Sequence, residues 1–517
     1  MNYKKLFKTG IFAGGLVLAL SSFASRILGV LRDRIIASKF GATGDLDAYF
    51  AAFRIPDVVY NLLILGAFSS AFIPIFTSYL AKGKKKEAFE IASTILNLTL
   101  IIILLVLGLV LIFTPSLVSV LGGFSTEQKE LTVNLTRLLL LSPILFGLSN
   151  IFSGILNSFK KFVAYAFAPI IYNLGIIFGA YFLSAEYGIY GVVIGVIIGA
   201  LGHLLVQIPS AVKLGFRYKP VLKLHRDVVK IGHLMLPRIF GLGMMQINLL
   251  VITVIASNLS EGSLTVFNFA NNLQSFPIGI FGISLAVSSF PFLSEAASTN
   301  NSSLFQKHFT NTFGRICYFI IPVSLLMWLL REQIVRLVLG AGEFSWEATQ
   351  LTSLSLGYFT FSLFAAALIA LLARSFYAIQ NTRTPVIISI VSMVVNIAGS
   401  LILSQKMGVA GLALAFSIAT ILQFLLLFIF LKLEMVTLHL KKLANRVLVI
   451  IVSTAIMGLV AWVLLGFTNN IFDLRTFMGV FMEASLVTIG SLLVYGFMTY
   501  IFRDEEIRAL ASKVFKK

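Results

Sequence analysis

The sequence predicts an all-α protein that crosses a membrane about fourteen times, and three observations lead to this prediction. Of the 517 residues, 58% are hydrophobic and 12% are charged, with a mean hydropathy of +0.97. A soluble domain could not cover its surface with so few polar groups. Apolar stretches of about 20 residues, the length of a helix that spans a bilayer, recur along the chain. Basic residues cluster in every second loop between these stretches.

The net charge of +19 is distributed over loops rather than over one polar face, which argues against a nucleic-acid partner. Basic clusters that alternate from loop to loop are typical of the positive-inside rule. This rule predicts cytoplasmic termini and an even number of spans, and the same charges would attract anionic lipid headgroups. The basic segments are Lys4–Lys8, Lys82–Lys86, Lys160–Lys161, Lys213–Lys230, Lys307, Arg383, Lys432–Arg446 and the tail from Arg503.

Several classes of chemistry have no signature in this chain. The one cysteine, Cys317, excludes an internal disulfide, and the five histidines show no zinc-binding spacing. No phosphate-binding GxxxxGK[ST] loop is present. We therefore expect no metal, no cofactor and no enzymatic activity. Any energy that the protein uses would come from a gradient or a partner rather than from ATP hydrolysis by this chain.

The first residues resemble a signal peptide, with Lys4–Lys8, an apolar run and a possible cleavage site at Phe23–Ser25. The helical pattern, however, continues without a break to Phe40. We expect this segment to be retained as the first membrane helix.

Apolar periodicity and Gly, Pro and Asn punctuation place fourteen helices. The even number agrees with the charge bias. The expected spans are 10–39, 46–81, 87–115, 128–158, 163–184, 189–214, 229–257, 264–297, 305–330, 347–379, 384–404, 409–434, 444–466 and 476–502.

Residue pairs at a near-constant spacing indicate that the first six helices are repeated in the next six. Since each copy has an even number of spans, the repeats would be parallel, with a central cavity between two lobes. The predicted divisions are an N-terminal lobe (1–215), a basic amphipathic cytoplasmic linker (216–228), a C-terminal lobe (229–435) and two further helices with a tail (436–517). The pairs are Phe50 with Phe267 and Pro74 with Pro291 (267 − 50 and 291 − 74, both 217), and Gly188 with Gly408 and Gly191 with Gly411 (408 − 188 and 411 − 191, both 220).

Charged residues within the first predicted helix need water or partners. Arg26 and Arg32 lie one turn to either side of Gly29, and Asp33 adjoins the same sector, so together they form a concave polar face. Guanidinium groups bind pyrophosphate or carboxylate oxygens in bidentate fashion. The alternative is that Arg32, Asp33 and Arg34 lie near the helix end and reach the membrane interface.

The second and eighth helices carry further candidates. Arg54 is a further substrate-binding candidate. Arg54 and Asp57 flank Pro56, where a gate could bend, although the two charges could simply form an internal ion pair. Four polar residues at i, i+3, i+4, i+7 spacing form a stripe on the eighth helix. This stripe would bind sugar or peptide groups or, alternatively, hydrogen-bond to other helices. Its members are Asn268, Asn271, Asn272 and Ser275, and Arg238 and Arg374 are weaker cavity candidates.

Several motifs resemble those of the MurJ/MviN family. The motifs occur in the order and at the spacing expected of this family, and together they extend over nearly the whole chain. They are Ser25–Asp33, Phe40–Ala42, Asp47–Pro56 and Gly66–Pro74 in the first half, and Gly340–Phe344 and Ser375–Pro385 in the second.

This resemblance implies fourteen helices in two six-helix lobes, as in the multidrug/oligosaccharidyl-lipid/polysaccharide exporter superfamily, with helices 13 and 14 forming a groove for a polyprenyl tail. It also implies a function: moving lipid II, the undecaprenyl-pyrophosphate-linked peptidoglycan precursor, to the outer leaflet of the bacterial inner membrane for cell-wall synthesis.

The resemblance places Arg26, Arg32 and Asp47 on charged positions of the family motifs, the two arginines being associated with the substrate cavity. This chain departs from the pattern elsewhere. Tyr60 and Asn272 replace two cavity arginines. Polar or apolar residues also replace acids at Leu65, Ser275 and Asn381.

We expect transport by alternating access in a monomer, with lipid II as substrate, membrane lipids around it, and Na+, H+ or the membrane potential as the driving force. Three alternatives stay open. The chain could flip another polyprenyl-linked oligosaccharide, export drugs in exchange for a cation, or act as a non-transporting cell-wall scaffold.

Overall fold

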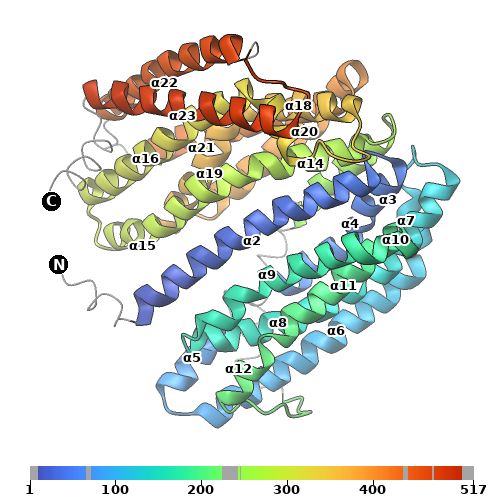
Figure 1. Ribbon diagram of the computed structural model, residues 1–517. Coiled ribbons are helices and arrows are strands. Elements are labelled where there is room, and N and C mark those ends of the chain that lie inside the picture. The colour runs from blue at the N-terminus through green and yellow to red at the C-terminus, as the bar shows by residue number, and fades with distance from the viewer. Residues whose placement is uncertain are drawn as a thin grey trace. The chain divides into compact units, whose positions relative to one another are not determined.

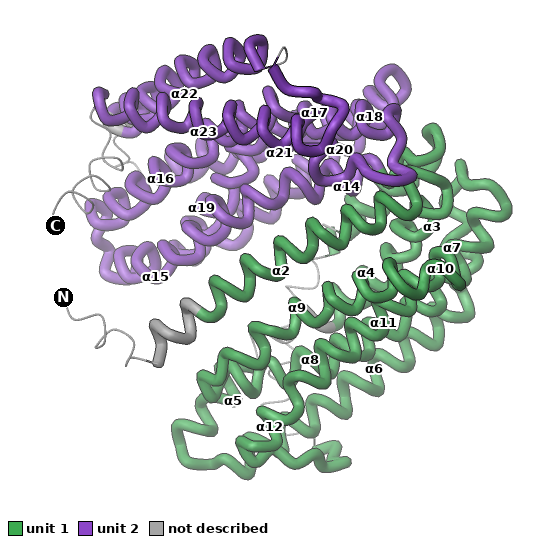
Figure 2. The backbone as a smooth tube through the Cα atoms, viewed as in Figure 1, with its two compact units in different colours: residues 1–265 green, residues 266–517 purple. Residues whose placement is uncertain are grey.

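The computed structural model describes residues 10–65, 72–223, 243–244, 246–434, 440–468 and 471–502. Every element in these ranges is a helix, which confirms the predicted all-α class. The chain forms two compact units, unit 1 with residues 1–265 and unit 2 with residues 266–517 (Figure 2). The residues before Gly10, Gly66–Ala71 of the second motif, Arg238 and the tail from Arg503 lie outside the described ranges.

Ten helices among the described residues are long and apolar enough to cross a membrane, and one bent pair raises the number to 11. The protein is therefore polytopic, as predicted. The ten are Lys85–Ser119, Thr126–Ser158, Phe162–Tyr187, Ile189–Lys213, Ser263–Ser298, Ser302–Leu329, Arg383–Met407, Val409–Glu434, Leu443–Thr468 and Phe477–Ile501, and the bent pair is Trp346–Thr360 with Leu363–Ala378.

Unit 1 is a bundle of helices (Figure 1). Its core is rich in phenylalanine and includes the fully buried Phe72 and Phe76. Its elements are α2 (Gly10–Phe40), α3 (Gly44–Ala52), α4 (Arg54–Tyr60), the π-helix η1 (Asn61–Leu65), α5 (Ile73–Ala81), α6 (Lys85–Ser119), α7 (Thr126–Leu139), α8 (Leu141–Ser158), α9 (Phe162–Phe178), the π-helix η3 (Gly179–Leu183), α10 (Ser184–Tyr187), α11 (Ile189–Leu205), α12 (Ile208–Lys213) and the helix Gln246–Ser257.

Glycines allow α9 and α11 to pack with their backbones in direct contact. A Cβ atom on Gly175 would lie 2.3 Å from Cα of Gly199, and one on Gly195 would lie 2.7 Å from Cα of Gly179. In a membrane, where no hydrophobic effect drives helices together, such close approach gives the van der Waals contact that holds them. These glycines therefore bring α9 to its fixed place beside α11.

The described part of the predicted linker, residues 216–223, is irregular rather than helical and is attached to unit 1. Phe216 is buried against the ring of Phe89. The amide of Asn97 on α6 donates to the carbonyls of Lys219 and Val221 at 3.2 and 3.0 Å. The polar Asn97 in an apolar helix thus satisfies backbone groups of the linker.

Unit 2 contains α15 to α23 and nearly all of α14. Its elements are α14 (Ser263–Pro277), the π-helix η4 (Ile278–Ile283), α15 (Ser284–Ser298), α16 (Ser302–Leu329), α17 (Arg331–Val338), α18 (Trp346–Thr360), α19 (Leu363–Ala378), α20 (Arg383–Met407), α21 (Val409–Glu434), α22 (Leu440–Thr468) and α23 (Phe477–Ile501).

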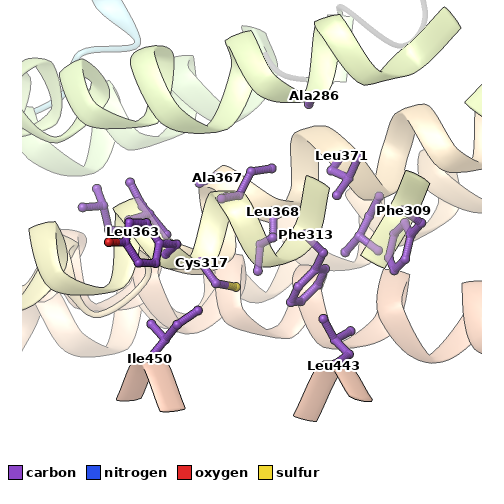
Figure 3. Close-up of a cluster of buried hydrophobic side chains, with 14 of the residues drawn as sticks. Ala286, Phe309, Phe313, Cys317, Leu363, Ala367, Leu368, Leu371, Leu443 and Ile450 are labelled. Carbon is purple, nitrogen blue, oxygen red and sulfur yellow. The ribbon is translucent and has the colours of Figure 1, made fainter. Parts of the chain in front are cut away.

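One continuous core joins α16, α19 and α22 of unit 2. Figure 3 shows Phe313 of α16 between Leu368 of α19 and Leu443 of α22, with Phe309 of α16 to one side. Cys317 lies in the same cluster and is buried. The first of the two additional C-terminal helices is therefore part of the core of unit 2.

Unusual local conformations recur along the chain at the spacing of the predicted repeat. Residues with positive φ occur at Gly83 and Asn300, at Lys160 and Gln380, and at Gly188 and Gly408, and the π-helices η1 and η4 begin at Asn61 and Ile278. Gly188 and Gly408 have nearly the same backbone angles, with φ of 53° and 58° and ψ of −135° and −139°. Only glycine adopts this region without strain, so the two turns need the same residue.

Several predicted helices are interrupted where the sequence suggested continuity, including the following two. The helix expected over 46–81 breaks at Phe53 and passes through η1, and the one expected over 347–379 bends by 47° between α18 and α19. At this bend the hydroxyl groups of Thr360 and Ser362 donate to carbonyls of the preceding turn, Gly357 and Phe359. Such bonds compete with the helical pattern and favour a bend.

Candidate functional site

A polar cluster in unit 1 joins the predicted charged face of α2 to α9. Arg32 donates from Nε and Nη2 to Oδ1 of Asp33 at 3.0 and 2.8 Å, and from Nη1 to Oδ1 of Asn173 at 3.2 Å. Nδ2 of Asn173 donates to Oγ of Ser25 at 3.1 Å. Asn173 therefore contacts α2 on both sides of Gly29, and a methyl group on Gly29 would lie 3.9 Å from its Oδ1 atom.

This cluster orients the Arg32 guanidinium. Asp33 is buried, and its carboxylate compensates the charge of a half-buried arginine. Because three guanidinium nitrogens already have partners, the plane of Arg32 is set by Asp33 and Asn173 before any ligand arrives.

Arg26 lines a cleft of ≈ 340 Å³ between α2 and α9. Ser22 and Ser25 of α2 and Tyr165 and Pro169 of α9 contribute to the same cleft. Arg26 therefore faces open space, whereas Arg32 is held by protein partners. The guanidinium and hydroxyl groups of this cleft are suited to an anionic oxygen-rich ligand.

Tyr60, which the resemblance places at the position of a cavity arginine, belongs to an aromatic and amide cluster. Its hydroxyl oxygen accepts from Nδ2 of Asn150 on α8 at 3.1 Å, and its ring packs against Phe146 with centroids 5.5 Å apart. The ring of Phe146 also contacts Tyr172 of α9. This position offers hydroxyl and ring surface rather than positive charge.

Arg54 lies at the start of α4 and donates from Nε to Oγ1 of Thr253 at 2.8 Å. Its charge also interacts with Asp57, one turn along the same helix. Pro56 is buried in the first turn of α4, where its missing N–H removes no helical hydrogen bond. The helix interruption at Phe53 therefore precedes Pro56.

Asp47 caps the first turn of α14. Its carboxylate accepts from the backbone N–H groups of Gly262 and Thr265 at 2.8 and 2.7 Å, and from Oγ1 of Thr265 at 2.7 Å. Glu261, which precedes α14, in turn accepts from the N–H of Gly44, the first residue of α3, at 2.6 Å. Carboxylates at both helix starts accept from N–H groups that have no partner within the helix, and they also stabilise the helix dipoles.

Replacing Asp47 with alanine is expected to lower stability by about 1–3 kcal/mol, because two buried N–H groups lose their acceptor. Thermal unfolding of the purified protein in detergent measures this effect. Asp45→Ala is the matched control, since Asp45 is exposed on the same helix. Equal unfolding temperatures for the two variants would contradict the assigned role of Asp47.

The polar stripe on α14 in unit 2 is partly turned inward. Asn268 and Asn271 are half-buried, whereas Asn272 and Ser275 are exposed. Asn271 accepts from Nε2 of Gln274 at 3.0 Å through its Oδ1 atom. Its carbonyl accepts from the hydroxyl of Ser275 at 2.7 Å. In α19, Arg374 is half-buried and donates to Ala370 of its own helix at 2.9 Å.

Asn150, Asn173, Thr253 and Glu261 were missed as site residues in the sequence. A polar residue in a strongly apolar segment was the available signal for Asn150 and Asn173. Within the ranges that the structure describes, no three His, Cys, Asp or Glu side chains are grouped to hold a metal ion.

The fold and this polar face together define a polytopic α-helical membrane protein with an anion-suited cleft between α2 and α9. The family model "Lipid II flippase MurJ" matches residues 36–482. A "Probable lipid II flippase MurJ" of Vibrio cholerae is 32% identical over 441 residues, which is 82% of both chains. The chain belongs to the MurJ lipid II flippase family, a family of transporters, and is a multi-pass protein of the inner membrane.

Solved structures agree with this membership. The structure of "Lipid II flippase MurJ, inward closed conformation" covers 94% of this chain and 98% of its own length, with a TM-score of 0.79 and 29% identity. A multidrug resistance MATE family transporter of the MOP superfamily, in an inward-facing conformation, has a TM-score of 0.67 at 16% identity, with 80% of this chain and 96% of its own covered. The second match shows a shared fold alone.

Proposed function

We propose that this chain moves lipid II from the inner to the outer leaflet of the bacterial inner membrane, where it supplies cell-wall synthesis. The observation that carries the proposal is the match of the family model over residues 36–482, together with relatives named as lipid II flippases. Translocation of an intact lipid requires binding and release, and no covalent step.

In this proposal the anionic pyrophosphate binds at the α2–α9 cleft. Arg26 supplies the open guanidinium, and Arg32, held by Asp33 and Asn173, fixes the positive charge six residues along α2. Charge-assisted bonds to phosphate oxygens are about twice as strong as neutral ones. Gly29 lies beside Asn173, where a Cβ atom would make ordinary van der Waals contact, and we assign it a structural role in this face of α2.

The remaining candidates recognise uncharged parts of the headgroup. Tyr60 and the amides of the α14 stripe offer hydroxyl and amide groups where other members place arginines, and these groups suit sugar and peptide. Arg54 belongs to the proposed substrate-binding residues. Asp57, Pro56 and Asp47 act in positioning or gating, since each lies in or beside a helix start or interruption.

The proposed architecture has fourteen spans, with two parallel six-helix repeats around a central cavity and both termini in the cytoplasm. The recurring turns at Gly188 and Gly408 and the π-helices η1 and η4 support the repeat. The lobes are residues 1–215 and 229–435, joined by the linker 216–228, and residues 436–517 provide a groove for the polyprenyl tail and a cytoplasmic tail. The transporter acts as a monomer.

Alternating access moves the headgroup, with Na+, H+ or the membrane potential as the driving force. The potential alone supplies about 2.3 kcal/mol per charge per 100 mV, which favours expulsion of an anionic headgroup.

Binding in detergent tests the headgroup assignment. The wild-type protein is expected to bind lipid II more tightly than a polyprenyl-linked glycan that lacks the pyrophosphate. Equal affinity for the two lipids would contradict the proposed binding of pyrophosphate at the α2–α9 cleft.

A further inference from the structure

The three tryptophans of the chain gather around the short helix α17 of unit 2. Trp328 is near the end of α16, Trp346 begins α18, and Trp462 lies in the last turns of α22. The guanidinium of Arg331 lies 5.4 Å from the Trp328 ring. Tryptophan is enriched where lipid headgroups meet the hydrocarbon core. We therefore assign α17 to the depth of the headgroups, at the end of α22 away from its basic residues.

A pocket of ≈ 640 Å³ lies between α17, the end of α22 and the start of α23. One wall is apolar and open to the surface, since Trp462 and Val463 are 67% and 60% exposed. The other wall is polar. It consists of Glu332, Gln333, Arg336 and Glu483.

The polar wall is rigidly built. Glu483 is only 1% exposed, and its carboxylate accepts from Nε2 of Gln333 at 3.0 Å and from Oγ1 of Thr468 at 3.2 Å. Arg336 donates to the carbonyl of Leu474 and stacks its guanidinium 5.4 Å from the Trp346 ring. These bonds fix α17 to the connection between α22 and α23, so the pocket is formed without a ligand.

The charges at this pocket are one guanidinium and two carboxylates. Glu332 lies one turn before Arg336 on α17, is exposed, and has no ion-pair partner among the residues that the structure describes. A ligand that complements this arrangement carries a phosphate for Arg336 and an ammonium group for Glu332. Its apolar part would lie along Trp462 and Val463.

We propose that this pocket binds the headgroup of an amine-bearing phospholipid such as phosphatidylethanolamine. The ammonium of ethanolamine has N–H groups that donate to carboxylates, whereas the trimethylated ammonium of choline has none. A headgroup with net negative charge would meet two carboxylates and be repelled. In the proposed topology this lipid belongs to the outer leaflet, and its site is separate from the lipid II cleft in unit 1.

Competition between lipids of matched acyl chains tests this proposal. Purified protein is equilibrated with phosphatidylethanolamine, phosphatidylcholine or phosphatidylglycerol in mixed micelles, and the lipid retained after size exclusion is measured by mass spectrometry. Retention of phosphatidylethanolamine is expected to exceed that of phosphatidylcholine about three- to tenfold, the range for a partly exposed charge-assisted bond.

Glu332→Gln is expected to abolish this preference, whereas Glu347→Gln, an exposed acid outside the pocket, keeps it. Arg336→Lys retains the positive charge and is therefore expected to retain the preference for phosphatidylethanolamine. It is compared with Arg336→Gln, which also disturbs the contact with Leu474. A preference that survives Glu332→Gln, or stronger retention of phosphatidylglycerol, would overturn the proposal. Neither readout depends on lipid II transport.

Discussion

Replacing Arg26 with alanine is expected to slow lipid II translocation in proteoliposomes about tenfold to a hundredfold. The variant loses the guanidinium that faces the α2–α9 cleft, and a charge-assisted bond of this kind contributes about 1.5–3 kcal/mol. The fold should be unaffected, because Arg26 borders open space rather than the core. The initial rate of lipid II appearance in the opposite leaflet measures the effect.

Arg26→Lys should recover part of the rate, since lysine keeps the charge but cannot bind two phosphate oxygens in one plane. Lys39→Ala is the matched control, because Lys39 is exposed at the end of the same helix. If Arg26→Ala translocated lipid II as fast as Lys39→Ala, Arg26 would have no part in substrate binding.

Replacing Gly195 with leucine is expected to prevent correct packing of unit 1. Its Cβ atom would lie 2.7 Å from both the carbonyl oxygen of Gly175 and Cα of Gly179, so backbone must move rather than a side chain. Overpacking typically costs about 1–3 kcal/mol, and a clash between two helix backbones lies at or above the upper end. The yield of monodisperse protein and the unfolding temperature in detergent should both fall.

Gly108→Leu is the control, because a Cβ atom at Gly108 of α6 would meet nothing within 4 Å. The same loss of yield in both variants would indicate a general intolerance of leucine in these helices rather than a specific α9–α11 contact.

The long helices were predictable because their signal is local. The first was expected over 10–39 and extends from Gly10 to Phe40, and the one expected over 409–434 has these bounds in the structure. Apolar periodicity and flanking glycines suffice to predict the bounds of a helix that lies in lipid, because neighbouring helices alter these bounds little. The short helix α17 was missed because it has only eight residues, half of them polar, which are too few for a periodic pattern.

The partners of the charged residues were not predictable from the sequence. Asp33 adjoins Arg32 in the chain, but Asn173 is 141 residues away and reaches Arg32 only because glycines place α9. Asp47 was recognised as a motif residue, yet its acceptor role at α14 depends on Gly262 and Thr265. Periodicity identifies which face of a helix is polar, whereas the partner depends on packing between distant segments.

Translocation of lipid II by the wild-type protein alone tests the central proposal most directly. Proteoliposomes with lipid II in one leaflet should show it reaching the other leaflet faster than protein-free vesicles of the same lipid composition. Another polyprenyl-linked glycan in the same vesicles should cross more slowly. If lipid II crossed no faster than in protein-free vesicles while the other glycan did, the assigned substrate would be wrong and the fold would be unaffected.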